Sequence, residues 1–365
     1  MAGHLLDTAR TPRTFALLDT DGFVDELHHR LPAARSHVEV QLMTFDGDRS
    51  GLAVAGALID AARRGVRVRL LVDSFAHRFV SDRPVRRADV RPEYRRTVAM
   101  FDELRAGGVE LRFTRPNGPL NVFAMARNHK KMYVIDDTAY LGGVNVSDHN
   151  FAWHDFMVRI DEASMVTAVV ADFDRTFAGG GPPVGGPIIT DRALEATFDE
   201  MLSTARHRVI VASPYALDRH LVRALTASPA PERLVVVADH NNFRVLQAIT
   251  PYLAGRLRTA GVALRRYHRF SHCKFVLVDD DRLLIGSSNY GRHSFWCNEE
   301  IGLVIRDRAF IAEAETLLLA GLVEVDTEGT LPLQAFGWGA SAGMDLLLRL
   351  YSHLIVPRVA PLARP

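Results

Sequence analysis

The strongest constraint in this 365-residue chain is a pattern of residues that occurs twice. "RNHKKMYVIDDTAYLGGVN" occupies residues 127–145, and "SHCKFVLVDDDRLLIGSSN" occupies residues 271–289. Each stretch reads His-x-Lys, four residues, Asp, and later Gly-x-x-Asn, and its second copy lies 143 residues after the first, from His129 to His272. That offset is longer than the period of a solenoid repeat, so the pattern predicts two fused copies of one structural unit.

The segments before each copy also follow one order of elements. A strand leads to a helix and a second strand, and then to a helix, a glycine break and a third strand. We therefore expect an α/β fold with two similar α/β/α halves, each with a mixed, mostly parallel central sheet, related by a pseudo-twofold axis. The expected ranges are 36–45, 52–74 and 98–113 in the first half, and 207–215, 219–227, 232–240 and 249–267 in the second.

The stretch "AGGGPPVGGP" at residues 178–187 has the composition of a linker. We expect an N-terminal half over residues 1–177, a C-terminal half over residues 188–330, and a C-terminal extension over residues 331–365. Within that extension, residues 341–357 are apolar but too interrupted to cross a bilayer. They predict an amphipathic helix that either packs on the body or lies in a membrane interface.

The basic residues are distributed unevenly by type. The chain has 44 Lys and Arg, and its three lysines, Lys130, Lys131 and Lys274, all lie inside the two motifs. Because arginine provides positive charge everywhere else, these places need an ammonium group in particular. The net charge of +1 and the aromatic content of 8% do not favour a nucleic-acid-binding surface.

The cellular compartment can be argued from cysteine usage and from the hydrophobic runs. Two cysteines do not make a disulfide framework, which favours a reducing compartment. The first fifteen residues contain no apolar core of a secretion signal, and no run of 18 apolar residues predicts a membrane span. We expect a cytoplasmic protein, with peripheral contact to the inner face of the membrane as an open alternative.

The apolar residues inside each motif, "MYVI" and "FVLV", predict a strand. Residues two apart on a strand share a face, so His129 and Lys131 would point into one site, and His272 and Lys274 would do the same. The motif aspartates come seven residues after each histidine and would point to the other face. We therefore interpret Asp136 and Asp279 as structural carboxylates.

Both stretches resemble the HKD motif of the phospholipase D superfamily, H-x-K-x4-D followed by G-[GS]-x-N. The resemblance covers residues 36–305, and residues 41–74 and 140–160 also resemble bacterial cardiolipin synthases. It implies that the two motifs meet where two similar halves face each other. It also implies that the N-terminal motif carries the nucleophile, His129, and that His272 acts as general acid and base.

The residue types suit phosphodiester cleavage. One imidazole can attack phosphorus and form a phosphohistidine, while the other protonates the leaving oxygen and then activates water or an alcohol. The ammonium groups of Lys131 and Lys274 and the amides of Asn145 and Asn289 can hold the non-bridging oxygens. No metal or cofactor is expected. The remaining motif positions, interpreted as structural, are Gly142, Gly143, Gly286 and Ser287.

Each histidine also needs a partner for its other ring nitrogen. By the family resemblance, a carboxylate 25 to 30 residues after each histidine has this role, which selects Asp155 for His129 and Glu300 for His272. Glu299 is the rival to Glu300. Several neighbours stay open: the hydroxyls of Ser287 and Ser288 are favoured as turn residues over a catalytic role, Asn298 serves either the backbone or the site, and Trp153 and Trp296 line either a groove or the core.

We expect a metal-independent phosphodiesterase or phosphatidyltransferase that acts on phospholipids through a phosphohistidine, of phospholipase D or cardiolipin synthase type. An anionic glycerophospholipid is the expected substrate, and the sequence favours neither water nor an alcohol as acceptor. The alternative is a nuclease of the same superfamily. A non-catalytic binding protein is disfavoured because both motifs are complete. The arginine-rich residues 83–96 either attract an anionic headgroup or form a solvated loop.

Overall fold

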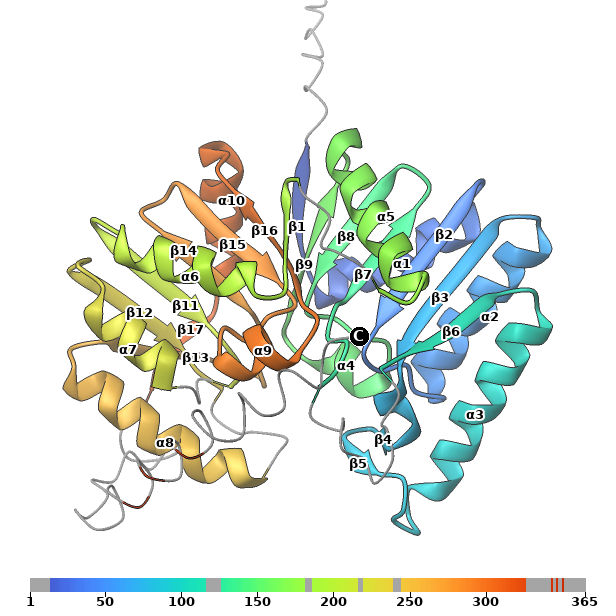
Figure 1. Cartoon of the computed structure of the whole chain (residues 1–365), viewed down its shortest axis with the longest axis horizontal. Coiled ribbons are helices and arrows are strands. Elements are labelled where there is room, and N and C mark those ends of the chain that lie inside the picture. Colours follow the sequence, from blue (N-terminus) through green and yellow to red (C-terminus); the bar gives the residue numbers. More distant parts are fainter. Residues whose placement is uncertain are drawn as a thin grey trace, which may run out of the picture.

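Two open sheets, one from each half of the chain, form the centre of the molecule (Figure 1). The computed structural model describes residues 14–115, 126–180, 186–215, 219–238 and 244–325, together with residues 343, 346 and 350. Within these residues, no helix is both long enough and apolar enough to cross a membrane.

The two sheets have the same strand order over seven positions. The first sheet runs β1 (Phe15–Asp19), β9 (Phe156–Ile160), β8 (Thr138–Gly142), β7 (Met132–Ile135), β2 (His37–Leu42), β3 (Arg67–Asp73) and β6 (Glu110–Thr114). The second runs β10 (Ile188–Thr190), β16 (Ile301–Ile305), β15 (Arg282–Gly286), β14 (Phe275–Val278), β11 (Arg208–Ala212), β12 (Glu232–Val236), β13 (Ala263–Tyr267) and then β17 (Leu322–Glu324). The expected duplication of one α/β unit is confirmed by this order.

The sheets are mixed, as predicted, but the expectation of mostly parallel strands is corrected. Among the described strands, β2, β3 and β6 are parallel in the first sheet, as are β11, β12 and β13 in the second. All other neighbours in the two large sheets are antiparallel. For β7 with β8 and for β14 with β15 the reason is local: each pair is joined by two or three residues, and such a short connection joins only antiparallel strands. Other antiparallel neighbours, such as β1 with β9 and β2 with β7, come from distant parts of the chain.

The helices form three layers around the two sheets. On strand β7, Tyr133 and Ile135 point into the outer core with the first three helices, whereas Met132 and Val134 point into a central core between the sheets. The outer layers are α1 (Thr20–Ala33), α2 (Arg49–Arg63) and α3 (Arg91–Ala106) on the first sheet, and α6 (Ala193–Ser203), α7 (Arg219–Ala227) and α8 (Arg244–Thr259) on the second. The central layer holds α5 (Ala163–Phe177) and α10 (Arg308–Leu318).

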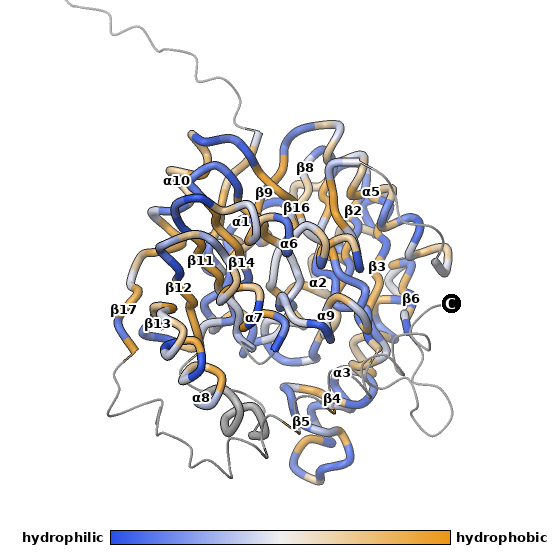
Figure 2. The backbone as a smooth tube through the Cα atoms, turned by 60° about the vertical axis from the view of Figure 1, so that its left-hand side comes forward, coloured by the Kyte–Doolittle hydropathy of each residue, from blue (hydrophilic) through white to orange (hydrophobic). Residues whose placement is uncertain are grey.

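This layering explains the apolar runs in the sequence. Figure 2 shows hydrophobic backbone stretches in central strands such as β9 and β14, which are covered on both faces. Shorter elements lie at the ends of the sheets: the 3-10 helix η1 (Ser74–His77), the hairpin of β4 (Phe79–Val80) and β5 (Arg83–Pro84), and the short helices α4 (Asp148–Ala152) and α9 (Arg292–Cys297).

Two parts of the predicted domain organisation stay predictions. Helix α5 ends at Phe177 and β10 begins at Ile188, on either side of the expected linker, whose residues 181–185 lie outside the described residues. The expected amphipathic helix over residues 341–357 also lies outside them, apart from three helical, exposed positions at 343, 346 and 350.

Each motif aspartate connects the turn after one central strand to the start of the neighbouring strand. Asp136 and Asp279 have left-handed backbones, with φ of 54° and 52°, in the turns after β7 and β14. Each side chain accepts hydrogen bonds from three consecutive N–H groups at the start of a neighbouring strand. The donors are Arg35, Ser36 and His37 for Asp136, and Arg206, His207 and Arg208 for Asp279. These contacts fit the structural role predicted for both carboxylates.

We predict that Asp136→Ala lowers the free energy of unfolding by about 2–4 kcal/mol, because several donors lose their acceptor and alanine is strained at this φ. Asp136→Asn is the matched control, since asparagine keeps an acceptor oxygen and tolerates the left-handed backbone. Urea denaturation at pH 7 measures both. An alanine variant as stable as the native chain would contradict the prediction.

The same carboxylate predicts a pH dependence. Burial raises the pKa of Asp136, but the hydrogen bonds from Ser36 and the neighbouring backbone outweigh it and hold the pKa below its ordinary value. Its contribution to stability is therefore complete above the ordinary pKa of an aspartate and is lost as the pH falls through the lowered pKa of the folded state. The Asp136→Asn variant should lack this acid-dependent part.

Candidate active site

The two motifs meet where the halves of the chain face each other. His129 and His272 lie in extended segments just before β7 and β14, not on the strands as predicted. The N–H of His129 donates to the carbonyl of Glu299 at 2.9 Å, and the N–H of His272 donates to the carbonyl of His154 at 2.8 Å. Each motif is thus attached to the opposite half of the chain through its own backbone.

The orienting carboxylates are exchanged between the halves. Nδ1 of His129 lies 2.9 Å from Oε1 of Glu300, and Nδ1 of His272 lies 2.8 Å from Oδ2 of Asp155. The prediction selected both carboxylates but paired each with the histidine of its own half, and that pairing is wrong. The segment before β7 runs beside the segment before β16, and the segment before β14 runs beside the one before β9, so each histidine meets the other half's carboxylate.

The motif lysines complete the buried cluster. Nζ of Lys131 donates to the carbonyl of His129 at 2.7 Å, and Nζ of Lys274 donates to the carbonyl of His272 and lies 3.4 Å from Oδ2 of Asp155. Both lysines are buried. Two imidazoles, two lysine amino groups and two carboxylates are therefore gathered in the interior where the halves meet.

Burial sets the protonation of this cluster. It lowers the pKa of His272 to about 4, and the ammonium group of Lys274 acts in the same direction. Burial also lowers the pKa of His129, and it lowers that of Lys131 to about 7. Both imidazoles are consequently neutral near pH 7. Because a carboxylate only accepts hydrogen bonds, the contact with Glu300 places the hydrogen of His129 on Nδ1 and leaves a lone pair on Nε2. Nδ1 of His272 faces Asp155 in the same way, while Nζ of Lys274 lies 2.8 Å from Nδ1 and 3.2 Å from Nε2 of that ring.

The motif asparagines are held by the backbone around them. Oδ1 of Asn145 accepts hydrogen bonds from the N–H groups of Met43 and Thr44 at 3.2 and 3.3 Å, which leaves its amide nitrogen to donate elsewhere. Asn289 is fixed through its main chain, whose carbonyl accepts from Oγ of Ser213 at 2.9 Å. Contact of either amide with a phosphate stays a prediction.

The glycines of the motif reflect close approach of neighbouring groups. A Cβ at Gly142 or Gly286 would lie 2.2 Å from a carbonyl oxygen of the adjacent strand. A Cβ at Gly143 would lie 2.1 Å from Oδ2 of Asp155. At the equivalent position of the second motif, the hydroxyl of Ser287 donates to Glu300 instead. In the first half, therefore, the motif leaves no room for a side chain beside Asp155. In the second half, the motif supplies a hydroxyl that donates a hydrogen bond to Glu300.

The residues left open by the sequence take separate positions. Asn298 serves both backbone and site, because it donates to Oε1 of Glu300 at 3.3 Å and accepts from the N–H of Arg127. Oγ of Ser288 accepts from the N–H of Tyr290, as a turn residue does. The ring of Trp153 lies 5.0 Å from that of His272.

The other features left open by the sequence contact groups outside the cluster. Trp296 lies against the guanidinium groups of Arg192 and Arg292. Glu299 forms an ion pair with Arg115 at 2.6 Å, whereas Glu300, the other candidate, contacts a motif histidine. In the arginine-rich segment, Arg83 and Arg87 form ion pairs with Asp89, and residues 91–96 belong to α3 and not to a loop.

Lys130 was missed by the sequence reasoning. Its Nζ lies 2.6 Å from Oδ2 of Asp172 in α5, both side chains are fully buried, and Arg175 pairs with the same carboxylate. In an extended segment, Lys130 must point away from the face shared by His129 and Lys131. This alternation was the sequence signal that distinguishes Lys130 from the two motif lysines. The matching position in the second half is Cys273.

We predict that Gly143→Ala lowers the free energy of unfolding by about 2–4 kcal/mol, because the new methyl group overlaps the buried carboxylate of Asp155 and separates it from His272. Ser287→Ala at the equivalent position removes a hydroxyl without overlap and should cost about 1–2 kcal/mol. Denaturant unfolding of the two variants compares them directly. Equal stability of the two variants would contradict this account of the asymmetry.

Comparison with known proteins agrees with the fold and the motifs. The family described as cardiolipin synthase, PLD-like domain, matches residues 27–177 and 198–319. The major cardiolipin synthase ClsA of Bacillus subtilis (strain 168) is 28% identical over 75% of this chain and 61% of its own length. Cardiolipin synthase A of Pseudomonas syringae pv. syringae (strain B728a) is also 28% identical, over 79% of this chain and 64% of its own. The chain thus spans less than two thirds of either relative.

Solved structures share the architecture at lower identity. The phosphatidylserine synthase of Haemophilus influenzae Rd KW20 superposes with a TM-score of 0.69 at 13% identity, covering 96% of this chain and 95% of that one. The polyphosphate kinase of Porphyromonas gingivalis gives a TM-score of 0.58 at 14% identity, covering 93% and 55%. At such identities the likeness concerns the fold alone. By its matched residues, its duplicated motif and its two-sheet fold, the chain belongs to the phospholipase D-like domain family of cardiolipin synthases.

Proposed function

We propose that this protein is a phosphatidyltransferase of the cardiolipin synthase type, which acts on anionic glycerophospholipids through a phosphohistidine intermediate. The observation that carries the proposal is the exchange of carboxylates: each motif histidine is oriented by a buried carboxylate from the opposite half, beside a buried lysine. The names of the relatives, which are cardiolipin synthases, support the choice of a phospholipid substrate.

In the first step, Nε2 of His129 attacks the phosphorus atom while Glu300 holds Nδ1–H. The bond from nitrogen to phosphorus forms, the bond from phosphorus to the leaving oxygen breaks, and His272 gives that oxygen a proton. A bound phosphodiester raises the pKa of His272 from its lowered value, because a nearby anion favours the imidazolium. In the second step His272 takes a proton from the acceptor alcohol, whose oxygen displaces His129 from phosphorus.

The charge that develops on the non-bridging oxygens is balanced by Lys131 and Lys274, with Asn145 and Asn289 as further donors. The anion also raises the pKa of Lys131 from about 7, so the ammonium form prevails once substrate is bound. These groups supply the positive charge without a metal ion in the reaction. Because the substrate is a lipid, we expect the protein to work in contact with a membrane surface, on its cytoplasmic face.

The function is tested by incubating the purified chain in EDTA with phosphatidylglycerol vesicles, and separately with single-stranded DNA. We expect cardiolipin and glycerol from the vesicles and intact DNA. Phosphatidic acid in place of cardiolipin would show hydrolysis instead of transfer, and cleaved DNA with unchanged lipid would favour a nuclease. His129→Ala is expected to reduce lipid turnover by about 10⁴-fold, as loss of a catalytic nucleophile does.

A labelling variant distinguishes the roles of the two histidines. With a p-nitrophenyl ester of phosphatidic acid labelled at phosphorus, whose leaving group departs without a proton, His272→Ala should retain the label covalently, since the base that activates the acceptor is absent. His129→Ala should carry no label. The reverse pattern would exchange the two roles, and label on neither variant would contradict a phosphohistidine mechanism.

We predict that Lys131→Arg lowers kcat at least about 100-fold, because the guanidinium fork does not fit where a buried point charge donates to the carbonyl of His129. The matched control is Lys130→Arg, one residue away on the opposite face of the segment. It disturbs the buried pair with Asp172 and should reduce stability, but leave kcat within a few fold. Steady-state kinetics and thermal unfolding of both variants separate these outcomes.

A further inference from the structure

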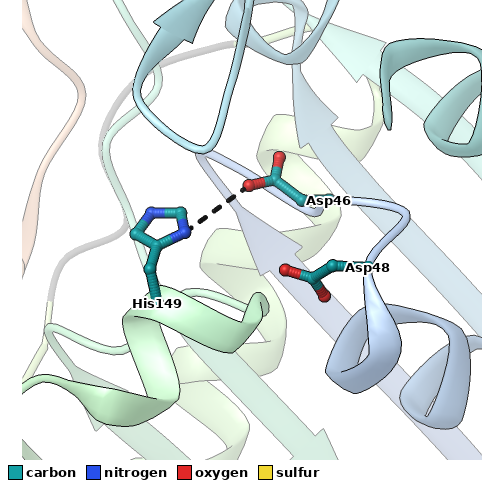
Figure 3. A group of neighbouring side chains, drawn as sticks. All are labelled: Asp46, Asp48 and His149. Atoms are coloured by element: carbon teal, nitrogen blue, oxygen red, sulfur yellow. Dashed lines mark ion pairs between the residues drawn. The ribbon is translucent and has the colours of Figure 1, made fainter. Parts of the chain in front are cut away.

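A second group of polar side chains lies beyond the end of β2, near the first motif. Asp46 and Asp48 belong to the loop between β2 and α2, and His149 belongs to α4. One oxygen or nitrogen of each lies within 4.8 Å of the others. Figure 3 shows the carboxylate of Asp46 and the ring of His149 facing each other, with Asp48 beside them. The phosphate chemistry proposed above uses none of these three residues.

Asp46 is the unusual member of this group. Its side chain is 1% exposed, Oδ2 accepts a hydrogen bond from the N–H of Ser81 at 3.0 Å, and Oδ1 is buried without a hydrogen-bond partner. The nearest ring nitrogen of His149 is 4.0 Å from Oδ2, too far for a hydrogen bond. Leaving a buried carboxylate oxygen unpaired is costly, and a positively charged ligand bound by Asp46 would offset that cost.

We propose that Asp46, Asp48 and His149 bind one divalent transition-metal cation, Zn²⁺ or Mn²⁺. Carboxylate oxygens together with an imidazole nitrogen suit these ions, whereas Ca²⁺ prefers oxygen ligands throughout. Ligand atoms on one tetrahedral Zn²⁺ lie about 3.4 Å apart, so the three side chains need to close by roughly an ångström. The carboxylate of Asp82 lies at the other ring nitrogen, with its Oδ2 3.4 Å from Nε2 of His149.

The ligands come from segments that are distant in the sequence and that backbone contacts already bring together: the N–H of Asp148 donates to Asp48, and the N–H of Ser81 donates to Asp46. Asp82 lies in the turn of the β4–β5 hairpin, where Ser81 and Asp82 have φ of 49° and 58°. A cation would therefore fasten this hairpin and the loop after β2 to α4. Trp153 directly follows α4, with its ring 4.9 Å from His149 and 5.0 Å from His272. The ion supports the rim of the phosphate site and takes no part in the reaction.

Metal binding is tested on the purified chain after treatment with EDTA and buffer exchange. Titration calorimetry with ZnCl₂ and with MnCl₂ should give one equivalent bound for at least one of them, and the same ion should raise Tm. Asp46→Asn and His149→Gln should each weaken binding at least 100-fold and abolish the Tm shift. Asp60→Asn, an exposed residue on α2 paired with Arg63, is the matched control and should bind as the native chain does.

Two other variants keep the test decisive. The two oxygens of Asp48 accept from the N–H groups of Gly51 and Asp148, so Asp48→Asn gives up one of these acceptors. Its Tm without added ion checks that it folds, and it should lose the ion as Asp46→Asn does. His129→Ala should keep the full equivalent, because the phosphate site is not the metal site. No Tm shift with either ion at millimolar concentration, or affinity unchanged in Asp48→Asn, overturns the proposal. Loss of the bound equivalent in His129→Ala would assign the ion to the phosphate site.

Discussion

The exchange of carboxylates between the halves is the contact on which the candidate site depends. Neither half alone orients its own histidine, since Glu300 reaches His129 and Asp155 reaches His272. The buried lysines and imidazoles would be unfavourable without these anions, because burial alone lowers the pKa of each basic group. Association of the halves and assembly of the site are therefore one event.

The duplication is close in architecture but unequal at the centre. Gly143 leaves room for Asp155, whereas Ser287 donates a hydrogen bond to Glu300. Lys130 forms a buried ion pair in the first half, and Cys273 occupies the same place in the second. Each inequality changes the surroundings of one histidine and not the other. Such differences would let the two imidazoles take the different roles that the proposed reaction gives them.

The structure also connects the motif to its surroundings through short chains of contacts. The loop after β2 holds Oδ1 of Asn145 by two backbone donors and continues directly into Asp46. The short helix after the motif carries His149 and leads to Trp153, whose ring meets His272. These contacts connect the loop after β2 and α4 to the motif residues Asn145 and His272.

The sequence by itself determined the local elements, the duplication and the identities of the motif residues. Strands, helices and glycine breaks follow from hydrophobic periodicity, and the repeated spacing marks the histidines and the lysines that share their face. Because neighbouring side chains in an extended segment point to opposite faces, the sequence also places Lys130 on the other face from Lys131. These properties depend on residues within a few positions of each other.

Only the tertiary structure decided which partners meet. The pairing of His129 with Glu300 joins residues 171 positions apart, and the hydrogen bond of Ser287 to that carboxylate matters only once the pair exists. The antiparallel neighbours in the sheets and the cluster of Asp46, Asp48 and His149 likewise arise from how the elements pack. Sequence spacing carries no record of such contacts, because they are set by the packing of two whole halves against each other.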